Sequence, residues 1–294
     1  MNTDKTNFRK KVIALLGIGL FTFGLTTLSL AETLSVKGSD TMVILGQKWA
    51  EVYMKQNKGV TVQVTGGGSG TGIAALLNGT TDICQASRPM KPKEKLDLKK
   101  KRGVDAYELS VALDGLALFV NNKNPLQELT ISQLKEIYTG EVTNWNELGG
   151  PNQKIILYGR ENNSGTYAYF KEHVLQDEDF TPRTQTLPGT AAIINAVSKD
   201  VKGIGYGGIA YGRGVKFIKI KKDAKSPSYE PSLANVENGS YPISRYLYWY
   251  TAGAPKGIIK KYADWVVSPA GQSIVKNVGY YPLPRKTNLT GKKK

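Results

Sequence analysis

Residues 154–170 read KIILYGRENNSGTYAYF, a sequence that predicts a strand, a short loop and the start of a helix. The apolar run at 154–160 is typical of a buried strand. Ser164 is a good helix N-cap, and Gly165 and Thr166 follow it. Arg160 ends the strand, and ligands of open α/β sheets bind beyond the carboxyl ends of strands. The stretch therefore predicts a catalytic loop, a nucleotide loop or a grip for an anion.

Strand-like and helix-like segments alternate along the rest of the chain, which is the pattern of α/β folds. Residues 104–122 form a long buried strand pattern that Asp114 and Gly115 interrupt. The other clear segments are helices at 41–57, 71–79 and 130–140 and strands at 60–70, 202–208 and 215–220. Thr130 is the expected N-cap of one helix, and Gly79 is expected to close another. We expect an α/β protein.

Two further strand-to-helix junctions have the design of the quoted loop, with glycine and hydroxyl residues directly before a helix. They are KGSDTM at 37–42 and GGGSGTGI at 66–73. A helix N-terminus presents unpaired N–H groups and a partial positive charge, and Ser or Thr hydroxyls add donors. Each junction alone is an ordinary cap, but three of them converging would form an anion site.

Nucleotide-binding and catalytic motifs fit poorly. No glycine loop is followed by Lys-Ser/Thr at the P-loop spacing, and GGGSGTG does not satisfy GxGxxG. His173 is the single histidine and Cys84 the single cysteine, so Cys/His catalysis and His-rich metal sites are not expected. We expect His173 on a helix surface and Cys84 buried. A phosphatase using Ser39 or Ser164 as nucleophile would need a base or a metal cluster beside it.

Asp114 stands inside the apolar run VALDGLALF, where an ionised carboxylate is costly unless it is paired. Two interpretations remain open. Asp114 and Gly115 form a kink between two strands, or Asp114 is a buried acceptor for a protonated ligand.

The N-terminal residues 1–31 have the pattern of a secretory signal peptide. A basic segment precedes the apolar run Val12–Leu30, and Ser29-Leu30-Ala31 fits a cleavage site. A retained membrane anchor is the alternative. Removal would leave 263 of the 294 residues and lower the net charge from +16 to +13, since the segment carries four basic residues and one acid. We expect an exported, periplasmic protein.

The basic excess does not indicate a nucleic-acid partner. The Lys-rich stretch 91–102 mixes its lysines with acids and leucines and has no aromatic residue, as in a solvated helix or loop. A general basic surface, or steering of a small anion, explains the charge.

Five motifs, in this order behind the signal segment, resemble the phosphate-binding proteins of bacterial high-affinity phosphate ABC transporters (the PstS-like family). They are GSDTM, GGGSGTGI, ALDGLA, IYTGEVTNWNELGG (137–150) and GRENNSGTY. The resemblance spans residues 34–283 and implies a type II periplasmic binding protein fold, with two α/β domains joined by crossover hinge strands. We expect one domain from 32–118 plus about 242–294 and the other from about 119–241, with the return crossover between Gly207 and Tyr246.

The resemblance also implies where phosphate binds. The expected ligand residues are Ser39, Thr41, Met42, Ser69, Gly70, Thr71, Ser87, Arg88, Asp114, Arg160, Ser164, Gly165 and Thr166. One departure concerns Arg88, which stands where many members have an aspartate that accepts the phosphate proton. We assign that role to Asp114, as in another branch of the family.

The implied function is capture of inorganic phosphate and its delivery to an ABC permease by a monomeric, non-enzymatic protein without metal, cofactor or nucleic acid. Three alternatives stay open. They are another tetrahedral oxyanion such as sulfate, molybdate or arsenate, a secreted serine-dependent phosphatase, and an adhesion or scaffold protein that has kept only the fold.

Overall fold

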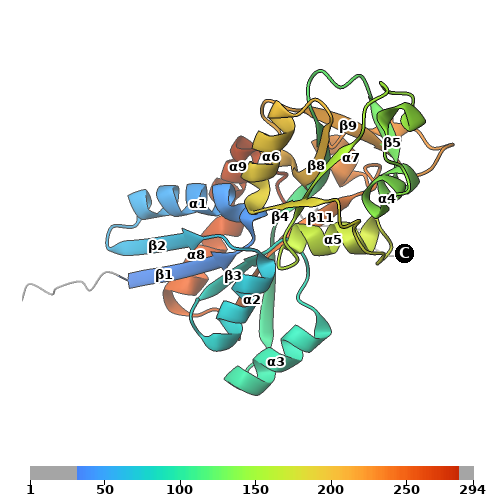
Figure 1. Ribbon diagram of the computed structural model, residues 1–294. Helices are drawn as coiled ribbons and strands as arrows, with labels where there is room; N and C mark the ends of the chain where they lie inside the picture. Colours follow the sequence, from blue (N-terminus) through green and yellow to red (C-terminus); the bar gives the residue numbers. More distant parts are fainter. Residues whose placement is uncertain (1–31, 285–294) are drawn as a thin grey trace, which may run out of the picture. The chain divides into compact units, whose positions relative to one another are not determined.

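A computed structural model describes residues 32–284, so the predicted signal peptide lies outside the described residues. Strands and helices alternate through this part of the chain, as the sequence predicts (Figure 1). The strands are β1 (Glu32–Gly38), β2 (Val60–Thr65), β3 (Ile83–Ala86), β4 (Ala106–Val120), β5 (Glu128–Thr130), β6 (Ile156–Arg160), β7 (Gln185–Leu187), β8 (Gly203–Gly208), β9 (Lys216–Lys221), β10 (Ser228–Tyr229) and β11 (Ser244–Ala252). The helices are α1 (Val43–Gln56), α2 (Ser69–Asn78), α3 (Pro92–Arg102), α4 (Ile131–Thr139), α5 (Gly165–His173), α6 (Gly189–Lys199), α7 (Leu233–Glu237), α8 (Gly257–Val267) and α9 (Pro269–Val278), with 3-10 turns η1 (Asp40–Met42), η2 (Trp145–Leu148) and η3 (Ile209–Tyr211).

The first lobe is a sheet with helices on both faces. Strands β1, β2 and β3 are parallel, and β11 lies antiparallel between β3 and β4. Successive side chains of a strand point to opposite faces. Leu247 and Trp249 of β11 accordingly pack with α1, α8 and α9, whereas Tyr248 and Tyr250 pack with α2 and α3. Alternation in β11 thus places helices on both sides of one sheet.

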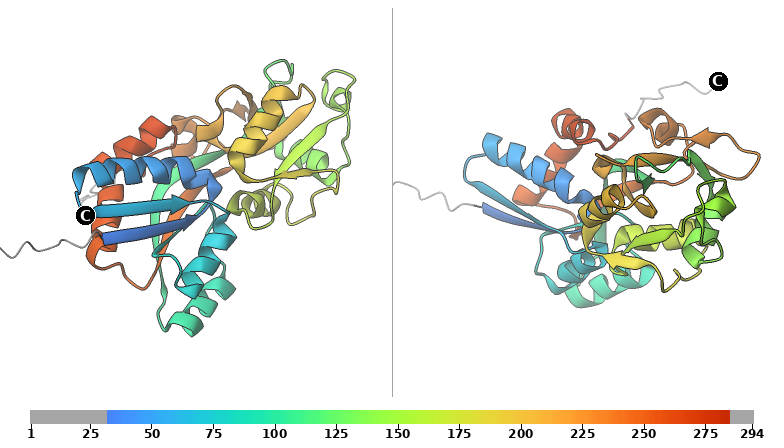
Figure 2. Two further views of the ribbon diagram at one scale, coloured as in Figure 1. Left: turned by 60° about the vertical axis from the view of Figure 1, so that its left-hand side comes forward. Right: turned by 45° about the horizontal axis from the view of Figure 1, so that its top comes forward.

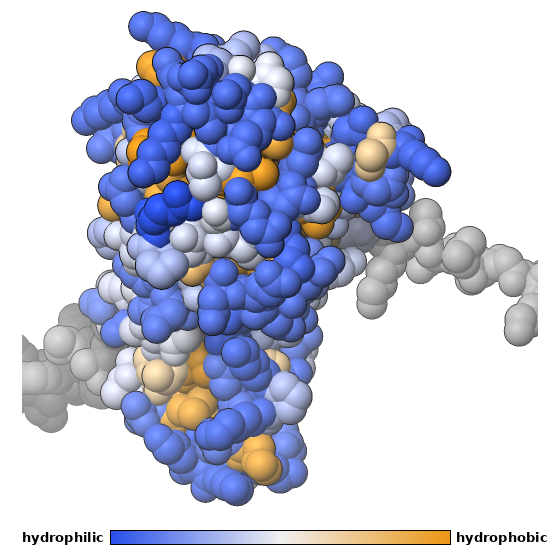
Figure 3. All heavy atoms as spheres, turned by 45° about the vertical axis from the view of Figure 1, so that its right-hand side comes forward, coloured by the Kyte–Doolittle hydropathy of each residue, from blue (hydrophilic) through white to orange (hydrophobic). Residues whose placement is uncertain are grey.

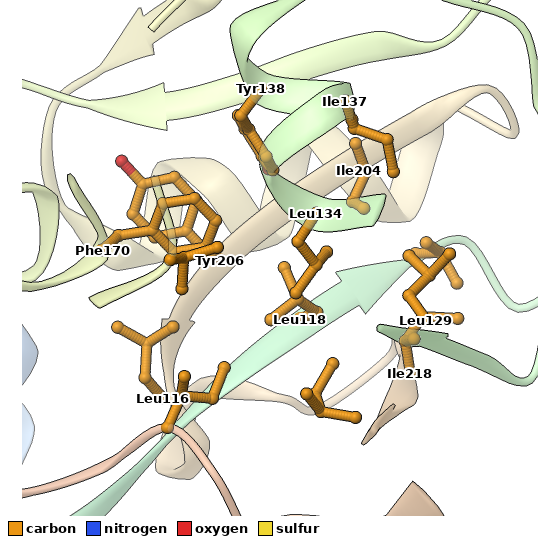
Figure 4. Packing of buried hydrophobic residues seen from close by; sticks show 14 of the residues in the cluster. Leu116, Leu118, Leu129, Leu134, Ile137, Tyr138, Phe170, Ile204, Tyr206 and Ile218 are labelled. Carbon is orange, nitrogen blue, oxygen red and sulfur yellow. The ribbon is translucent and has the colours of Figure 1, made fainter. Parts of the chain in front are cut away.

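The second lobe repeats this arrangement with other strands. Strand β8 joins β4 to β6 and β7, and β9 pairs with β4, β5 and β10. Leu116 and Leu118 of β4 point into a core with α4 and α5, which also holds Tyr138, Phe170 and Tyr206 (Figure 4). The intervening residues Ala117 and Phe119 face α6 on the opposite side.

Strand β4 belongs to both lobes (Figure 2). Residues 106–115 pair with β11, and residues 116–120 pair with β8. The predicted interruption at Asp114 and Gly115 is wrong, because β4 runs without a break through both residues. The polar Asp114 and the glycine at 115 mark the point at which β4 changes its partner strand from β11 to β8. The predicted domain limits of 32–118, 242–294 and 119–241 stay a prediction.

Several local predictions are confirmed. Thr130 caps α4 by accepting a hydrogen bond from Gln133 N–H, and Gly79 ends α2 in a left-handed conformation (φ +72°). His173 ends α5 on the surface, and Cys84 is buried. The Lys-rich stretch forms α3, of which only Leu98 is buried.

The face in Figure 3 is mostly hydrophilic, and its apolar side chains lie in small separate groups. The exposed large apolar side chains within residues 32–284 include Leu96, Val104, Tyr107, Val201 and Tyr246. Within the same residues, no helix is long and apolar enough to cross a bilayer.

Candidate functional site

The three predicted strand-to-helix junctions meet at one place. In Figures 1 and 2 the N-terminal ends of α1, α2 and α5 lie close to the ends of β1 and β3. The Ser164 hydroxyl caps α5 by accepting hydrogen bonds from the N–H groups of Thr166 (3.2 Å) and Tyr167 (3.3 Å). This cap ties Ser164 to the helix backbone and fixes the direction in which the first turn of α5 points.

Five hydroxyl groups form a connected, buried set that we call the hydroxyl cluster. It consists of Ser39, Thr41, Ser69, Ser87 and Thr166, each exposing 1% of its surface or less. Ser39 Oγ donates to Ser87 Oγ at 2.8 Å, and the Thr41 and Thr166 hydroxyls are 2.7 Å apart. Ser87 Oγ lies 3.4 Å from Ser69 Oγ and 3.5 Å from Thr166 Oγ1. The structure thus brings together five predicted site residues from four separate loops.

Gly165 lets the first turn of α5 lie directly against this cluster. A Cβ atom on Gly165 would stand 2.3 Å from Ser69 Oγ and 2.7 Å from Ser87 Oγ, closer than any side chain tolerates. The backbone of α5 therefore approaches the hydroxyls from the second lobe without an intervening side chain.

Three other predicted residues have backbone or loop contacts outside the hydroxyl cluster. Gly70 N–H donates to Asn163 O at 2.9 Å, and the Thr71 hydroxyl accepts from Asn163 Nδ2 at 3.2 Å. Met42 is buried, and its N–H closes the η1 turn onto Ser39 O. In these contacts Gly70 and Thr71 join the α2 loop to the loop before α5.

Arg160 is buried at the end of β6 and held on two sides. Nη2 donates to Asp40 Oδ2 at 2.8 Å, and Nη1 donates to Thr190 Oγ1 at 3.0 Å. Glu161 lies beside Nε at 3.6 Å. Asp40 is fixed in turn because its Oδ1 accepts from Gly67 N–H at 2.8 Å. The guanidinium is thereby anchored to a loop of the first lobe.

Asp114 is fully buried and paired with Arg245. Its Oδ2 accepts from Arg245 Nε (3.1 Å) and Nη2 (2.9 Å), and its Oδ1 accepts from Ile209 N–H (3.1 Å). Burial raises the pKa of Asp114, and the hydrogen bonds and charge of Arg245 oppose that rise. Arg245 Nη2 also donates to Thr166 Oγ1 at 2.9 Å, so the pair is connected to the hydroxyl cluster.

The structure commits Arg88 to a different contact. Its Nη1 and Nη2 form a bidentate pair with Glu94 of α3 at 2.8 and 2.7 Å, and Nη1 also donates to Pro89 O. Burial raises the pKa of Glu94, but the hydrogen bonds and charge of Arg88 outweigh it and hold the pKa below its usual value. No hydrogen bond joins Arg88 to the hydroxyl cluster among the described residues.

The phosphatase alternative requires a base or a metal cluster beside Ser39 or Ser164. Between residues 32 and 284, no group of three or more His, Cys, Asp or Glu side chains could hold a metal ion. Neither Ser39 nor Ser164 has a basic side chain as hydrogen-bond partner there. Burial raises the pKa of the Cys84 thiol, which disfavours the thiolate that a nucleophile needs.

Sequence reasoning missed three residues that contact the predicted site, namely Asp40, Thr190 and Arg245. Arg245 carried a usable signal, because it interrupts the apolar and aromatic run YPISRYLYWY much as Asp114 interrupts its own strand. Asp40 stands in the GSDTM motif between Ser39 and Thr41, which were both predicted as ligand residues. Thr190 lies in the first turn of α6 and carried no comparable signal.

Comparison with known proteins agrees with this geometry. A domain described as the PBP superfamily domain matches residues 26–270. The phosphate-binding protein PstS of Pseudomonas aeruginosa is 36% identical over 270 residues, which cover 86% of this chain and 84% of that protein. The chain belongs to the PstS family.

Other PstS relatives support the same assignment. Bacillus subtilis PstS is 32% identical over 256 residues, covering 85% of this chain and 81% of its own length. A phosphate ABC transporter substrate-binding protein from Clostridium perfringens, solved with bound phosphate, superposes with a TM-score of 0.78 at 30% identity, covering 86% of this chain and all of that chain. The predicted two-lobed α/β fold of periplasmic binding proteins is confirmed.

Proposed function

We propose that this PstS-family member captures inorganic phosphate between its two lobes and delivers it to an ABC permease. The observation that carries the proposal is the hydroxyl cluster. Hydroxyl groups from both lobes meet at one buried point, together with the first turn of α5 and the Asp114–Arg245 pair. The PstS relatives and the phosphate-bound neighbour support the choice of ligand.

In this proposal phosphate takes over hydrogen bonds that the hydroxyls now make with one another. Ser39, Thr41, Ser69 and Thr166 each turn an O–H toward a phosphate oxygen, and the N-terminal end of α5 adds a partial positive charge. Since Thr41 and Thr166 are 2.7 Å apart, their loops must separate to admit the ligand. Those loops belong to different lobes, so opening and closing of the lobes would control entry.

Asp114 provides the selectivity. Near neutral pH phosphate keeps a proton and sulfate does not, so the carboxylate can accept a hydrogen bond from phosphate but meets only lone pairs on sulfate. The mismatch leaves a buried acceptor unpaired, which costs about 1–3 kcal/mol and more when it is charged. Burial raises the pKa of Asp114 and so makes the carboxylate a stronger acceptor.

The remaining parts of the proposal follow the family. The protein binds rather than transforms its ligand, is exported by means of residues 1–31 and acts as a monomer. On the face in Figure 3 the apolar side chains lie in small separate groups, which supports the monomer. The thirteen predicted ligand residues remain proposals, with Arg88 and Thr71 less supported by their contacts.

Calorimetric titration of phosphate into protein freed of ligand by unfolding, dialysis and refolding tests the proposal. We expect saturable one-to-one binding and, for Asp114→Asn, weaker phosphate binding and a smaller preference over sulfate. Binding of molybdate or sulfate in place of phosphate would assign a different oxyanion. Hydrolysis of a chromogenic phosphate ester, abolished by Ser39→Ala or Ser164→Ala, would instead establish a phosphatase.

A further inference from the structure

Arg245 lies at the site but was not among the predicted ligand residues. It lies on β11 directly opposite Asp114 on β4. Residues directly opposite on neighbouring strands project from the same face of the sheet. Arg245 exposes 6% of its surface and Asp114 none, so both charges are buried at this face.

The donors of Arg245 are only partly used. Nε and Nη2 bind Asp114 Oδ2, and Nη2 also donates to Thr166 Oγ1 at 2.9 Å. Nη1 is buried and has no hydrogen-bond partner within residues 32–284. Buried polar groups are nearly always paired, so an unpaired guanidinium nitrogen needs an explanation.

The planar shape of the guanidinium sets the direction of the free donor. The Nη2 N–H that does not face Asp114 reaches the Thr166 hydroxyl, and one N–H of Nη1 runs parallel to it. Nη1 therefore points to the same side as the hydroxyl cluster. The two parallel N–H groups form a fork, in which Nη2 binds the Thr166 hydroxyl and Nη1 remains free for an oxygen of an anion.

The surroundings hold the Arg245 guanidinium in place. The Arg245 guanidinium carbon lies 5.1 Å from the centre of the Tyr169 ring, which supports it by a cation–π contact. A cavity of about 710 Å³ is lined by Arg245 and Tyr169, together with the basic residues Arg88, Lys91 and Lys171 and the acidic residues Glu172 and Asp177. Arg245 thus lines this cavity and also contacts the hydroxyl cluster through Thr166.

We propose that Arg245 is a direct ligand of the bound anion, donating from Nη1, and that it acts with Asp114 as one recognition unit. Arg245 binds an ionised oxygen, and Asp114 accepts from the protonated oxygen. The unit thereby fits hydrogen phosphate, which carries both kinds of oxygen. This inference rests on the proposed function.

The competing explanation is that Arg245 only positions Asp114. A double-mutant cycle with inorganic phosphate as the probe separates the two roles. Arg245→Gln should weaken phosphate binding by about 10- to 150-fold, the range for one hydrogen bond to a charged group. The same substitution made in an Asp114→Asn background should again weaken binding at least about tenfold, because the ligand contact is lost in both.

Two further variants complete the experiment. Arg245→Lys keeps the charge beside Asp114 but cannot form the fork, so it should also bind phosphate at least about tenfold more weakly. Arg213→Gln removes one exposed arginine and serves as the charge-matched control, with binding expected within about twofold of the original protein. Thermal unfolding followed by circular dichroism checks that each variant is folded.

The outcomes are distinct. If the Asp114→Asn variant and the Asp114→Asn/Arg245→Gln double variant bind phosphate equally well, Arg245 acts only through Asp114. If Arg245→Lys binds phosphate with full affinity, the fork is excluded. Should the glutamine variants fail to fold, the lysine variant decides. Absence of phosphate binding by the unaltered protein would instead refute the proposed function itself.

Discussion

The two buried arginines of the site are paired with carboxylates in different ways. Arg160 at the end of β6 and Asp40 in the η1 turn are 120 residues apart, and the Asp40 side chain keeps 22% of its surface exposed. Arg245 and Asp114 lie on neighbouring strands and expose 3% and 0% of their side chains. The first pair joins the two lobes, and the second is built into one sheet.

This difference separates two tasks. Moving the lobes apart must break Arg160–Asp40, because the partners belong to different lobes. Arg245 and Asp114 lie opposite each other within one sheet, so we expect their pair to persist when the lobes move. We therefore expect the first pair to affect opening and the second to keep the recognition groups ready for the next anion.

The largest stability effect should come from breaking the strand pair. Asp114→Ala leaves the Arg245 charge buried without its partner, so we expect a loss of about 3–5 kcal/mol in the free energy of unfolding. Urea denaturation followed by circular dichroism measures it. Asp264→Ala is the control, because its pair with Lys260 is exposed on both sides and should contribute at most about 1 kcal/mol. A loss for Asp114→Ala no larger than the control would remove the distinction between the pairs.

The lobe-joining pair should contribute less. Asp40→Ala removes one partner of Arg160 but leaves Thr190 and Glu161, and water can reach the position of Asp40. We expect a loss of about 1–2 kcal/mol in the same urea experiment. We also expect faster phosphate release in stopped-flow measurements, since a contact between the lobes is lost. A loss exceeding that of Asp114→Ala would reverse the comparison.

The preference for phosphate over sulfate should depend on pH through Asp114. Burial raises the pKa of Asp114, so this group takes up a proton at a higher pH than an ordinary aspartate. A protonated Asp114 donates a hydrogen bond to sulfate, so the preference for phosphate should fall as the pH falls through this raised pKa. Competition titrations from neutral to acidic pH measure the effect. Asp114→Asn should show no such change, and an equal change in that variant would assign the effect to another group.

The smallest effect concerns Arg88 and Glu94. Glu94→Gln should cost at most about 1 kcal/mol at neutral pH, because the pair is partly open to solvent. The pKa of Glu94 is lowered from 4.5, so its contribution is fully present above that pH and is lost as the pH falls through the lower pKa of the folded protein. Urea denaturation at neutral and acidic pH should show the difference shrinking. The affinity for phosphate should stay unchanged. A marked loss of affinity would indicate that Arg88 contributes to the anion site.

The sequence allowed the fold class and the hydroxyl residues to be predicted because both depend on local patterns. Apolar strand runs, the Thr130 and Ser164 caps and the glycine loops are each contained in a few consecutive residues. The family's motif order then supplied the two-lobed arrangement.

The partners of the charged residues could not be predicted in the same way. Asp114 was recognised as a buried charge, but its partner Arg245 is 131 residues away, and one sequence does not show which strands lie side by side. The uninterrupted course of β4 was missed for a related reason. A glycine after a polar residue indicates a kink locally, whereas here the sheet on either side holds the strand straight.

The continuity of β4 also affects how the protein can be divided. Its first ten residues complete one sheet and its last five complete the other, so a fragment cut at the boundary deprives one lobe of a strand. The lobes should therefore unfold in one cooperative transition despite their separate cores. Of the four tryptophans, Trp145 alone lies between residues 119 and 241, so its fluorescence and that of Trp49 should change at the same denaturant concentration.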